Sequence, residues 1–360
     1  MADPMKIATL GYYGFRNLGD EAVLAGIRAA LAKQIRDPGF LVLSNNPAET
    51  QKLHPGVQAV NRWKWREVAA SLKGTDLFVF GGGSLLQDAT SVKSVLWYTL
   101  MVLLARRRSR RVLWWGQGIG PLQSDVSRKL VRLIANQADA LTVRDSASAQ
   151  LLKEIGVQKP AEIVADPAFA LQPPTTKVPV KSSCIFAPRA WKDDTLGRMI
   201  GGNAGDFWRT FEGKTGAPTL ILPMHLPDDA NYVRQLPGGD KLSVADWNEG
   251  RLSVVQTLGL VAQSRFVVAM RLHALIFAAR CGVPFAALSY DPKVDALASA
   301  SGQEDVLVPV ELLTEEILFS ALERLAATSA QRRQQLQSFA LKQSNLAIRP
   351  AEIAADLYSA

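Results

Sequence analysis

Short, uniformly apolar segments alternate with helical segments along most of this 360-residue chain. Successive residues of a strand point to opposite faces, so a strand that is apolar throughout must be covered on both faces. Such strands occur in parallel sheets packed between helices, and the pattern therefore predicts an α/β protein. The expected strands are residues 6–10, 77–80, 111–115, 140–143, 184–187, 219–222, 266–269 and 285–288.

A proline-rich stretch divides this alternation into two similar halves. Residues 173–181 contain three prolines among small polar residues, which is typical of a linker. We therefore expect an N-terminal α/β domain over residues 1–172 and a C-terminal α/β domain over residues 182–360, closing with helices. Both domains are predicted to be doubly wound and Rossmann-like, with a cleft between them. Ligands of such folds bind at the carboxyl ends of the strands.

Composition and motifs exclude several classes of protein. Hydrophobic residues make up 48% and charged residues 21% of the chain, as in soluble globular proteins, and the first residues lack the pattern of a secretory signal. The cysteines, Cys184 and Cys281, lie far apart without metal-ligand spacing, which is typical of a reducing compartment. There is no phosphate-binding loop and no dinucleotide glycine spacing, and three histidines are too few for a histidine-rich metal cluster. We therefore expect a cytoplasmic protein without a metal or other cofactor.

Two glycine-bearing segments follow expected strands in the first half. Residues 14–21 lead into a helix, whose amino end and free N–H groups suit an anion; a tight turn capped by Asp20 is the alternative. Residues 81–83 are three glycines after a buried strand, and we interpret them as a place where a ligand approaches the backbone closely. Asp88 follows them, either as a base or sugar ligand near the cleft or as a helix cap.

Basic residues follow several expected strands in the second half. Arg271 offers a forked donor to phosphate or carboxylate, and His273 titrates near neutral pH. Because both stand at one strand–helix junction, we favour a functional over a structural interpretation. Arg189 and Lys293 each follow another strand and are, taken singly, equally compatible with surface charges. Together the four residues would line one rim and suit a small, multiply anionic substrate.

Five motifs, in order, resemble those of the bacterial polysaccharide pyruvyl transferase family. They are GYYGFRNLGDE at 11–21, GGGSLLQD at 81–88, GQGIGP at 116–121, MRLHA at 270–274 and SYDPKVD at 289–295. The likeness runs through most of the chain and is closest to the subgroup that pyruvylates N-acetylmannosamine in cell-wall polysaccharide. This family resembles GT-B glycosyltransferases in architecture, in agreement with the two predicted domains.

The resemblance implies that phosphoenolpyruvate is the donor and that its enolpyruvyl unit becomes a cyclic ketal on a sugar, with release of phosphate. The donor is expected on the C-terminal domain, at Arg271 and Leu272, with Arg189 as a second anion contact and Lys293 assisting. His273 is the candidate acid, either for the methylene carbon or for the departing phosphate.

The acceptor is expected on the N-terminal domain. Its contacts are predicted at Asn17, Gly82, Gly83 and Gln117, all within the family motifs. Asp88 or Asp20 is the candidate base for the acceptor hydroxyl. A GT-B glycosyltransferase that uses a nucleotide sugar is the alternative function, since it shares the architecture and the basic rim. A periplasmic sugar-binding protein is a third, disfavoured by the missing secretory signal and by the arginine–histidine junction.

An apolar segment with a basic end suggests a peripheral membrane contact. Residues 94–105 run directly into Arg106, Arg107, Arg108, Arg110 and Arg111, in a chain whose net charge is +8. Because the resemblance implies a sugar or lipid-linked saccharide acceptor, such a helix is a candidate for contact with the inner face of the membrane. The alternative is a buried covering helix with a solvated basic end. No nucleic-acid partner is expected.

Overall fold

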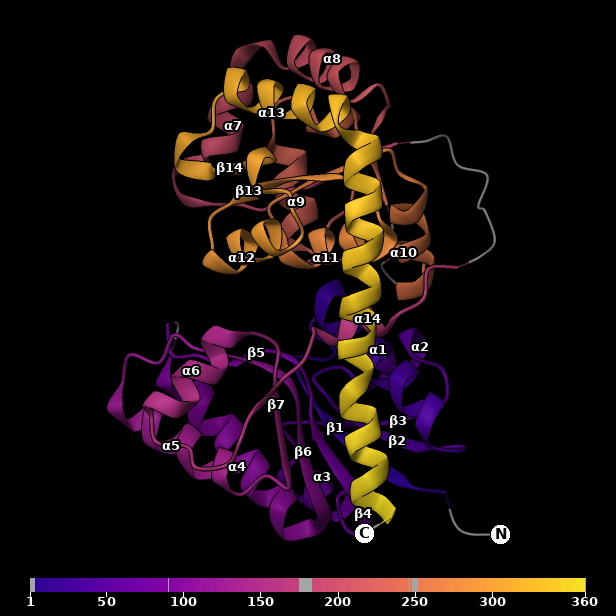
Figure 1. The fold of residues 1–360 in the computed structure, drawn as a ribbon, viewed down its shortest axis with the longest axis vertical. Coiled ribbons are helices and arrows are strands. Elements are labelled where there is room, and N and C mark those ends of the chain that lie inside the picture. The colour runs from indigo at the N-terminus through magenta and orange to yellow at the C-terminus, as the bar shows by residue number, and fades with distance from the viewer. Residues whose placement is uncertain (1–3, 90, 175–182, 246, 248–251, 360) are drawn as a thin grey trace. The chain divides into compact units, whose positions relative to one another are not determined.

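The chain folds into two α/β units, and Figure 1 colours the ribbon by position along the chain. The structure is a computed structural model, and it describes residues 4–89, 91–174, 183–245, 247 and 252–359. The first unit comprises Met1–Leu171 with Gln343–Ala360, and the second comprises Gln172–Lys342. Most of the predicted linker, residues 173–181, lies outside the described residues.

The first unit is built on a parallel sheet in the order β3-β2-β1-β4-β6-β7-β8, with β5 paired to β6. Each pairing between its described strands is parallel, and the direction of winding reverses between β1 and β4. The strands are β1 (Lys6–Leu10), β2 (Gly39–Ser44), β3 (Val57–Asn61), β4 (Thr75–Phe80), β5 (Gly83–Leu86), β6 (Ser109–Ile119), β7 (Ala140–Val143) and β8 (Glu162–Ile163). Its helices are α1 (Leu18–Gln34), α2 (Pro47–Leu53), α3 (Trp65–Ser71), α4 (Val92–Arg108), α5 (Asp125–Asn136), α6 (Ser146–Glu154) and the 3₁₀ turn η1 (Pro167–Ala170).

The second unit is built on a parallel sheet in the order β11-β10-β9-β12-β13-β14, which reverses between β9 and β12. Its strands are β9 (Cys184–Ala187), β10 (Thr219–Ile221), β11 (Ser243–Val244), β12 (Phe266–Ala269), β13 (Phe285–Ser289) and β14 (Leu307–Pro309). Its principal helices are α7 (Thr195–Ile200), α8 (Ala204–Thr215), α9 (Asp228–Gln235), α10 (Val254–Gln263), α11 (Leu272–Cys281), α12 (Pro292–Ala300) and α13 (Glu315–Ala327). Figure 1 shows α8 and α13 on one face of this sheet and α10, α11 and α12 on the other.

Both sheets are buried on both faces, as the apolar runs predicted. In β6, Trp114 and Trp115 point to opposite faces and each is fully buried. In β9, the same holds for Ile185 and Phe186. The doubly wound Rossmann-like prediction is therefore confirmed for each unit.

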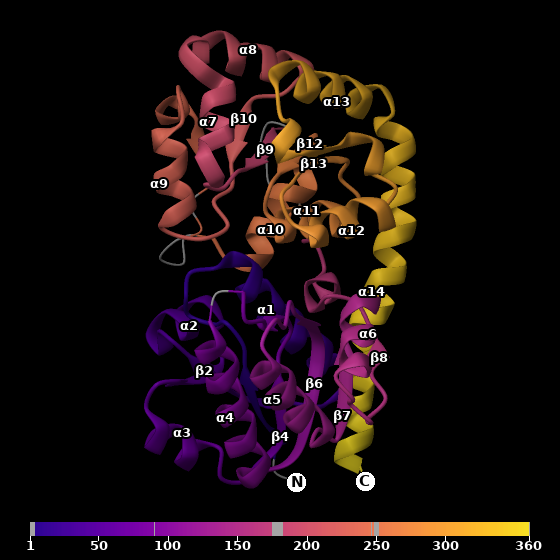
Figure 2. The same ribbon diagram turned by 90° about the vertical axis from the view of Figure 1, so that its left-hand side faces the viewer.

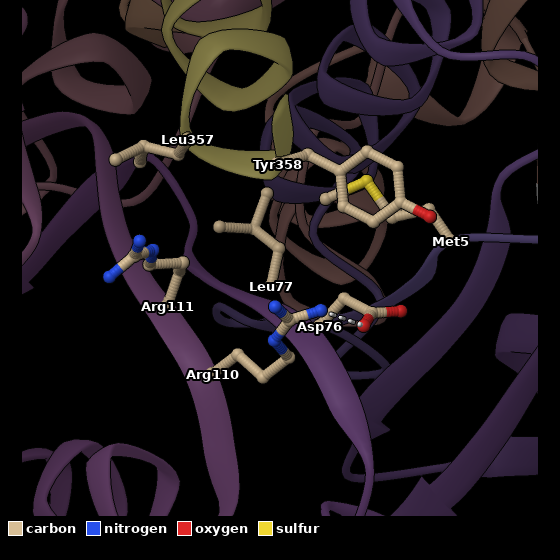
Figure 3. Close-up of a pocket in the computed structure, with 7 residues that line it drawn as sticks. All are labelled: Met5, Asp76, Leu77, Arg110, Arg111, Leu357 and Tyr358. Atoms are coloured by element: carbon tan, nitrogen blue, oxygen red, sulfur yellow. Dashed lines mark ion pairs between the residues drawn. The ribbon is translucent and has the colours of Figure 1, made fainter. Parts of the chain in front are cut away.

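The last helix belongs to both units, which corrects the expected boundary. Helix α14 (Ser329–Ser359) was predicted to lie wholly within the C-terminal domain, but its residues from Gln343 onward count with the first unit. Figure 3 shows Leu357 and Tyr358 of this helix facing Met5 and Leu77. A terminal helix carries no strand alternation of its own, so the sequence pattern does not indicate which sheet it packs against.

Every predicted strand is found in the structure, but several observed strands were not predicted. All eight expected strands are present, and β1, β7, β9 and β12 have the predicted bounds. The pattern analysis did not identify β2, β3, β8, β11 and β14. No strand was expected directly after the glycines, yet residues Gly83–Leu86 form β5, which pairs with β6 at Gln117 and Ile119.

The surroundings of two helix glycines predict that alanine substitution changes stability in opposite directions. Gly26 packs against η1, whereas Gly213 faces open space. A Cβ on Gly26 of α1 would lie 2.0 Å from the carbonyl oxygen of Pro167, whereas one on Gly213 of α8 meets nothing within 4 Å. We therefore expect Gly26→Ala to lower the free energy of unfolding by about 1–3 kcal/mol. Gly213→Ala should raise it by about 0.5–1 kcal/mol through helix propensity. Thermal unfolding of both variants beside the unmodified protein tests this, and stabilisation by both substitutions would contradict the packing.

Candidate functional site

The carboxyl edge of the second sheet gathers the predicted donor residues. Arg189 follows β9, Arg271 and His273 follow β12, and Lys293 follows β13. Strands β9 and β12 flank the point where the winding reverses, which is where folds of this kind bind ligands. The structure thus brings the four residues to neighbouring strand ends of one sheet.

Arg271 is held by a buried carboxylate that the sequence analysis missed. Its Nε donates to Oδ2 of Asp229 at 2.9 Å and its Nη2 donates to Oδ1 of the same residue. The side chain of Asp229 is 2% exposed and that of Arg271 is 17% exposed. In the sheet, β9 lies between β10 and β12. The ion pair therefore spans the end of β9 and connects Arg271, which follows β12, to Asp229 in α9, which follows β10.

Asp229 also fixes the loop after β10. Its Oδ2 accepts the backbone N–H groups of Met224 at 3.0 Å and His225 at 2.9 Å. His225 Nδ1 lies 3.4 Å from a carboxylate oxygen of Asp228. The loop thereby brings a second, half-buried histidine to this edge. His225 was missed in the sequence because it stands three residues beyond the expected strand at 219–222, without a recognisable motif.

Arg189 is placed by aromatic side chains. Its Nη1 donates to the hydroxyl of Tyr290 at 2.8 Å, and its guanidinium lies 4.8 Å from the centroid of that ring. The ring of Trp191 lies 5.7 Å from the guanidinium and 4.4 Å from the ring of Tyr290. Because Tyr290 follows β13, this second pair crosses the end of β12. Cation–π and hydrogen-bond contacts thus hold Arg189 without neutralising its charge.

The remaining donor candidates lie in first helical turns. Leu272 and His273 begin α11, whose amino-terminal cap residue is Arg271, and both are half-buried. Lys293 lies in the first turn of α12, where its backbone N–H donates to the capping carboxylate of Asp291 at 3.0 Å. Helix amino ends favour anions, so both helices add to the positive character of this edge.

In the first unit, Asp20 lies buried beside the glycine segment. A Cβ on Gly83, whose φ is +104°, would come 3.3 Å from Oδ1 of Asp20. Burial, together with the charges of Glu21 and Asp166, raises the pKa of Asp20 well above its ordinary value, and Arg144 offsets this in part. A carboxyl group with a raised pKa in a polar cluster is suited to proton transfer near neutral pH.

Arg144 and Asp166 complete this cluster, and the sequence analysis missed both. Arg144 Nη2 donates to the hydroxyl of Ser84 at 2.7 Å, and its Nη1 lies 3.5 Å from Oδ2 of Asp166. Asp166 also caps η1 by accepting the N–H of Ala168 at 3.0 Å. Arg144 directly follows the strand at 140–143, so its position after an expected strand was the available signal.

Asp88 has a structural role in this conformation. Its two carboxylate oxygens accept the N–H groups of Gln123 and Ser124 at 2.8 Å each, just before α5. Burial raises the pKa of Asp88, but these bonds and one from Ser127 outweigh it and place the pKa below its ordinary value. Asp88 therefore holds the turn before α5, whose amino-terminal cap is Ser124, and does not itself cap that helix. Its lowered pKa makes Asp20 the better candidate base, and a catalytic role of Asp88 stays a prediction.

Packing explains the glycines that were interpreted as a ligand approach. A Cβ on Gly81 would lie 2.2 Å from the hydroxyl of Tyr13, and one on Gly82 would lie 2.9 Å from the ring of Pro167. Gln117 is fully buried, and its Nε2 donates to the carbonyl groups of Phe80 and Gly81. The protein's own side chains therefore require small residues here. The acceptor roles of Gly82, Gly83 and Gln117 stay predictions.

The turn before α1 is fixed from within the unit. Asn17 caps α1 by accepting the N–H of Gly19 at 3.0 Å. Glu21 accepts the N–H of Gly14 at 2.9 Å and lies 2.8 Å from Nε2 of His54, with both side chains buried. The capped turn, which was the alternative interpretation of residues 14–21, is therefore present, with Asn17 rather than Asp20 as the cap. A role of Asn17 toward the acceptor stays a prediction.

One hollow lies at the opposite edge of the first sheet. It is lined by Met5, Asp76, Leu77, Arg110, Arg111, Leu357 and Tyr358 (Figure 3), near the beginnings of β4 and β6. Arg110 is 3.6 Å from Asp76 there. Because ligands of these folds bind at the carboxyl ends of strands, this hollow is no candidate for the main site. Within the described part of the chain, no three histidine, cysteine, aspartate or glutamate side chains are placed to hold a metal ion.

Comparisons with known proteins agree with this architecture. A model of the polysaccharide pyruvyl transferase family matches residues 17–292. No curated protein matches the chain. Solved structures with a similar fold include UDP-GlcNAc 2-epimerase from Methanocaldococcus jannaschii, with 14% identity, a TM-score of 0.59, and 89% of this chain and 92% of that chain covered.

Two further structures show the same likeness. UDP-GlcNAc 2-epimerase from Neisseria meningitidis, bound to UDP-GlcNAc, has 11% identity and a TM-score of 0.58 over 98% of this chain and 99% of that one. MnaA of S. aureus, solved with UDP, has 13% identity and a TM-score of 0.60 over 97% and 94%. At these identities the likeness concerns the fold, and it confirms a GT-B-like architecture.

Replacing each of the two buried aspartates by asparagine should change the stability at pH 8 in opposite directions. Asp20 has a raised pKa in the folded state, so folding loses stability as pH rises from about 4, where an unfolded aspartate ionises, toward the folded pKa. Asp20→Asn should therefore melt higher than the unmodified protein at pH 8, and the difference should vanish near pH 4. Asp88 has a lowered pKa, so the stability it contributes is present above about pH 4 and is lost as pH falls through the folded pKa.

Asp88→Asn should accordingly be less stable than the unmodified protein at pH 8, by about 1–2 kcal/mol for the weakened hydrogen bonds. Melting curves of both variants across this pH range make the comparison. Shifts of the same sign at pH 8 would show that one of the two environments is misassigned.

Proposed function

Because the chain belongs to the polysaccharide pyruvyl transferase family, we propose that it transfers the enolpyruvyl unit of phosphoenolpyruvate to a sugar as a cyclic ketal, with release of phosphate. The observation that carries this proposal is the row of basic groups at the carboxyl edge of the second sheet. Arg189, Arg271 and Lys293 stand there with His225 and His273. A donor with a carboxylate and a phosphate on three carbons needs several cationic contacts in a small space.

The two arginines are suited to different parts of the donor. Nε and Nη2 of Arg271 donate to the carboxylate of Asp229, which leaves Nη1 to donate to an anion. Arg189 retains its charge beside the rings of Tyr290 and Trp191, which shield one side of the guanidinium. We assign them jointly to the carboxylate and the phosphate, with Lys293 assisting. Both are oriented before the donor arrives, which reduces the entropy cost of binding.

The chemistry requires balanced proton transfers. A proton adds to the methylene carbon of phosphoenolpyruvate, C2 gains cationic character, and one sugar hydroxyl attacks it. The C2–O bond to phosphate then breaks, and a second hydroxyl of the sugar closes the ring. Of the two protons lost by the hydroxyl groups, one is balanced by the new methyl group and the other leaves with phosphate.

His273 is the proposed acid of the donor side, and Asp20 the proposed base of the acceptor side. Histidine is a common general acid in enzymes, and its ordinary pKa near neutral pH suits protonation of carbon or of leaving phosphate. The raised pKa of Asp20 lets this carboxylate accept a proton from a sugar hydroxyl more readily than Asp88 does. The cell-surface sugar, the lipid-linked acceptor and the cytoplasmic location stay predictions.

Removal of Arg271 tests the donor assignment. Arg271→Ala should lower phosphate release at limiting phosphoenolpyruvate by at least about 100-fold, because a charge-assisted contact to a buried anion contributes a few kcal/mol. Arg209→Ala is the matched control, since that side chain is 80% exposed in the middle of α8, outside the strand-end segments that hold the donor residues. Phosphate release is measured with phosphoenolpyruvate and a panel of acceptor sugars. Turnover of Arg271→Ala close to that of the control would refute the assignment.

Ligand-dependent melting separates this function from nucleotide-sugar transfer. Phosphoenolpyruvate should raise the melting temperature of the unmodified protein, since a ligand that binds only the folded state stabilises it by mass action. A UDP-sugar at the same concentration should not. A shift with the UDP-sugar alone would instead favour a glycosyltransferase.

Chelation tests the expectation that no metal takes part. Turnover with phosphoenolpyruvate should be unchanged after treatment with EDTA, because the proposed anion contacts are all side chains and helix ends. Loss of activity that one divalent ion restores would show that a metal site exists.

A further inference from the structure

The outer side of helix α4 is apolar where solvent would favour polar side chains. Its inner side is buried through Val95, Tyr98 and Met101, which confirms that the helix covers the first sheet. On the outer side, Val92, Leu96 and Leu100 recur every four residues and are 37%, 44% and 45% exposed. A helix at a protein surface normally presents its polar side to water. Val92, Leu96 and Leu100 together form the apolar stripe of α4.

Two exposed tryptophans extend this stripe. Trp63, two residues before α3, and Trp65, the first residue of that helix, are 49% and 41% exposed. Their ring centroids lie 5.1 Å and 6.3 Å from that of Trp97, which stands one helical turn before Leu100 on α4. Single exposed apolar residues are common on proteins, but a contiguous group marks a surface that binds something.

Basic residues surround the apolar group. Helices α3, α4 and α5 lie side by side on the first unit (Figure 2). Over residues 63–67, 92–108 and 125–136, the exposed basic residues are Lys64, Arg66, Lys93, Arg107, Arg108, Arg128, Lys129 and Arg132. Only Glu67 and Asp125 are exposed acidic residues in the same described ranges. This α3–α5 face therefore carries an excess of six positive charges, in a chain whose whole excess is eight.

The arginine cluster after the apolar segment contributes less than the sequence predicted. Arg106 pairs with Asp139 at 2.7 Å, and Arg110 lies 3.6 Å from Asp76. Arg111 lies 3.8 Å from the same Asp139. Arg107 and Arg108 remain as exposed charges in the last turn of α4.

We propose that the α3–α5 face docks onto an anionic lipid bilayer. The apolar stripe and the two tryptophans enter the headgroup region, where aromatic and aliphatic side chains are favoured. The surrounding lysines and arginines meet lipid phosphates. A nucleic acid would satisfy the charges but leave the leucines exposed, so the combination fits a bilayer better. No helix of the described residues is long and apolar enough to span a membrane, so this contact is peripheral. The inference does not rest on the proposed activity.

Vesicle flotation with the full chain tests the proposal. The unmodified protein is mixed with vesicles of phosphatidylcholine alone or of phosphatidylcholine with phosphatidylglycerol, at low and at high salt. One variant combines Leu96→Gln with Leu100→Gln, and another combines Arg107→Gln with Arg108→Gln. The matched apolar control combines Leu312→Gln with Leu341→Gln, whose side chains are 61% and 67% exposed elsewhere. The matched basic control is Arg36→Gln, 96% exposed. Melting curves confirm that each variant is folded.

The unmodified protein and both controls should float with anionic vesicles, and binding should weaken with salt. Removal of the two arginines should lower the affinity about 25-fold, since each contributes about fivefold at an anionic surface. Removal of the two leucines should lower it at least tenfold, by loss of about 1.5 kcal/mol or more of apolar burial. The proposal is wrong if the protein does not bind anionic vesicles, if binding is equal on neutral vesicles, or if the leucine variant binds like its control. It is also wrong if the leucine substitutions convert a dimer to a monomer in light scattering while vesicle binding is absent.

Discussion

The ion pair between Arg271 and Asp229 fixes the geometry on which the candidate donor site depends. The carboxylate of Asp229 is almost fully removed from water, and such a charge is stable only when its oxygens are matched by donors. Arg271 supplies two of these donors, and the N–H groups of Met224 and His225 supply the others. A change in any partner therefore disturbs the strand end of β12 and the loop after β10 together. The arginine is consequently held in place before a ligand binds.

The first unit places a different kind of group at its strand edge. Burial of Asp20, together with the charges of Glu21 and Asp166, makes its ionised form unfavourable, and Arg144 offsets this only in part. Such an arrangement costs stability, and groups of this kind are common where a protein transfers protons. The basic edge of the second unit suits a doubly anionic donor, and the buried carboxyl of the first suits activation of a hydroxyl. This division between the units is the basis of the proposed pyruvyl transfer.

The sequence predicted the strands and the strand-end residues well, because both follow from local patterns. Apolar runs identified the buried strands, and Arg271, Arg189 and Asp20 were found by their position after them. Partners from distant segments were missed. Neither Asp229 nor Tyr290 carries a local signal that it contacts Arg271 or Arg189. The packing requirement at Gly81 and Gly82 was missed for the same reason, because Tyr13 and Pro167 approach them from elsewhere in the chain. The shared terminal helix likewise depends on tertiary packing.

The most direct measurement is the affinity for phosphoenolpyruvate, determined by calorimetry for each variant of a double-mutant cycle of Arg271 and Asp229. The account predicts that Arg271→Ala and Asp229→Asn each weaken binding, and that Asp229→Asn has little further effect once Arg271 is alanine, because the aspartate acts through the arginine. Independent, additive losses would contradict that coupling. Unchanged affinity in Arg271→Ala would contradict the donor site itself.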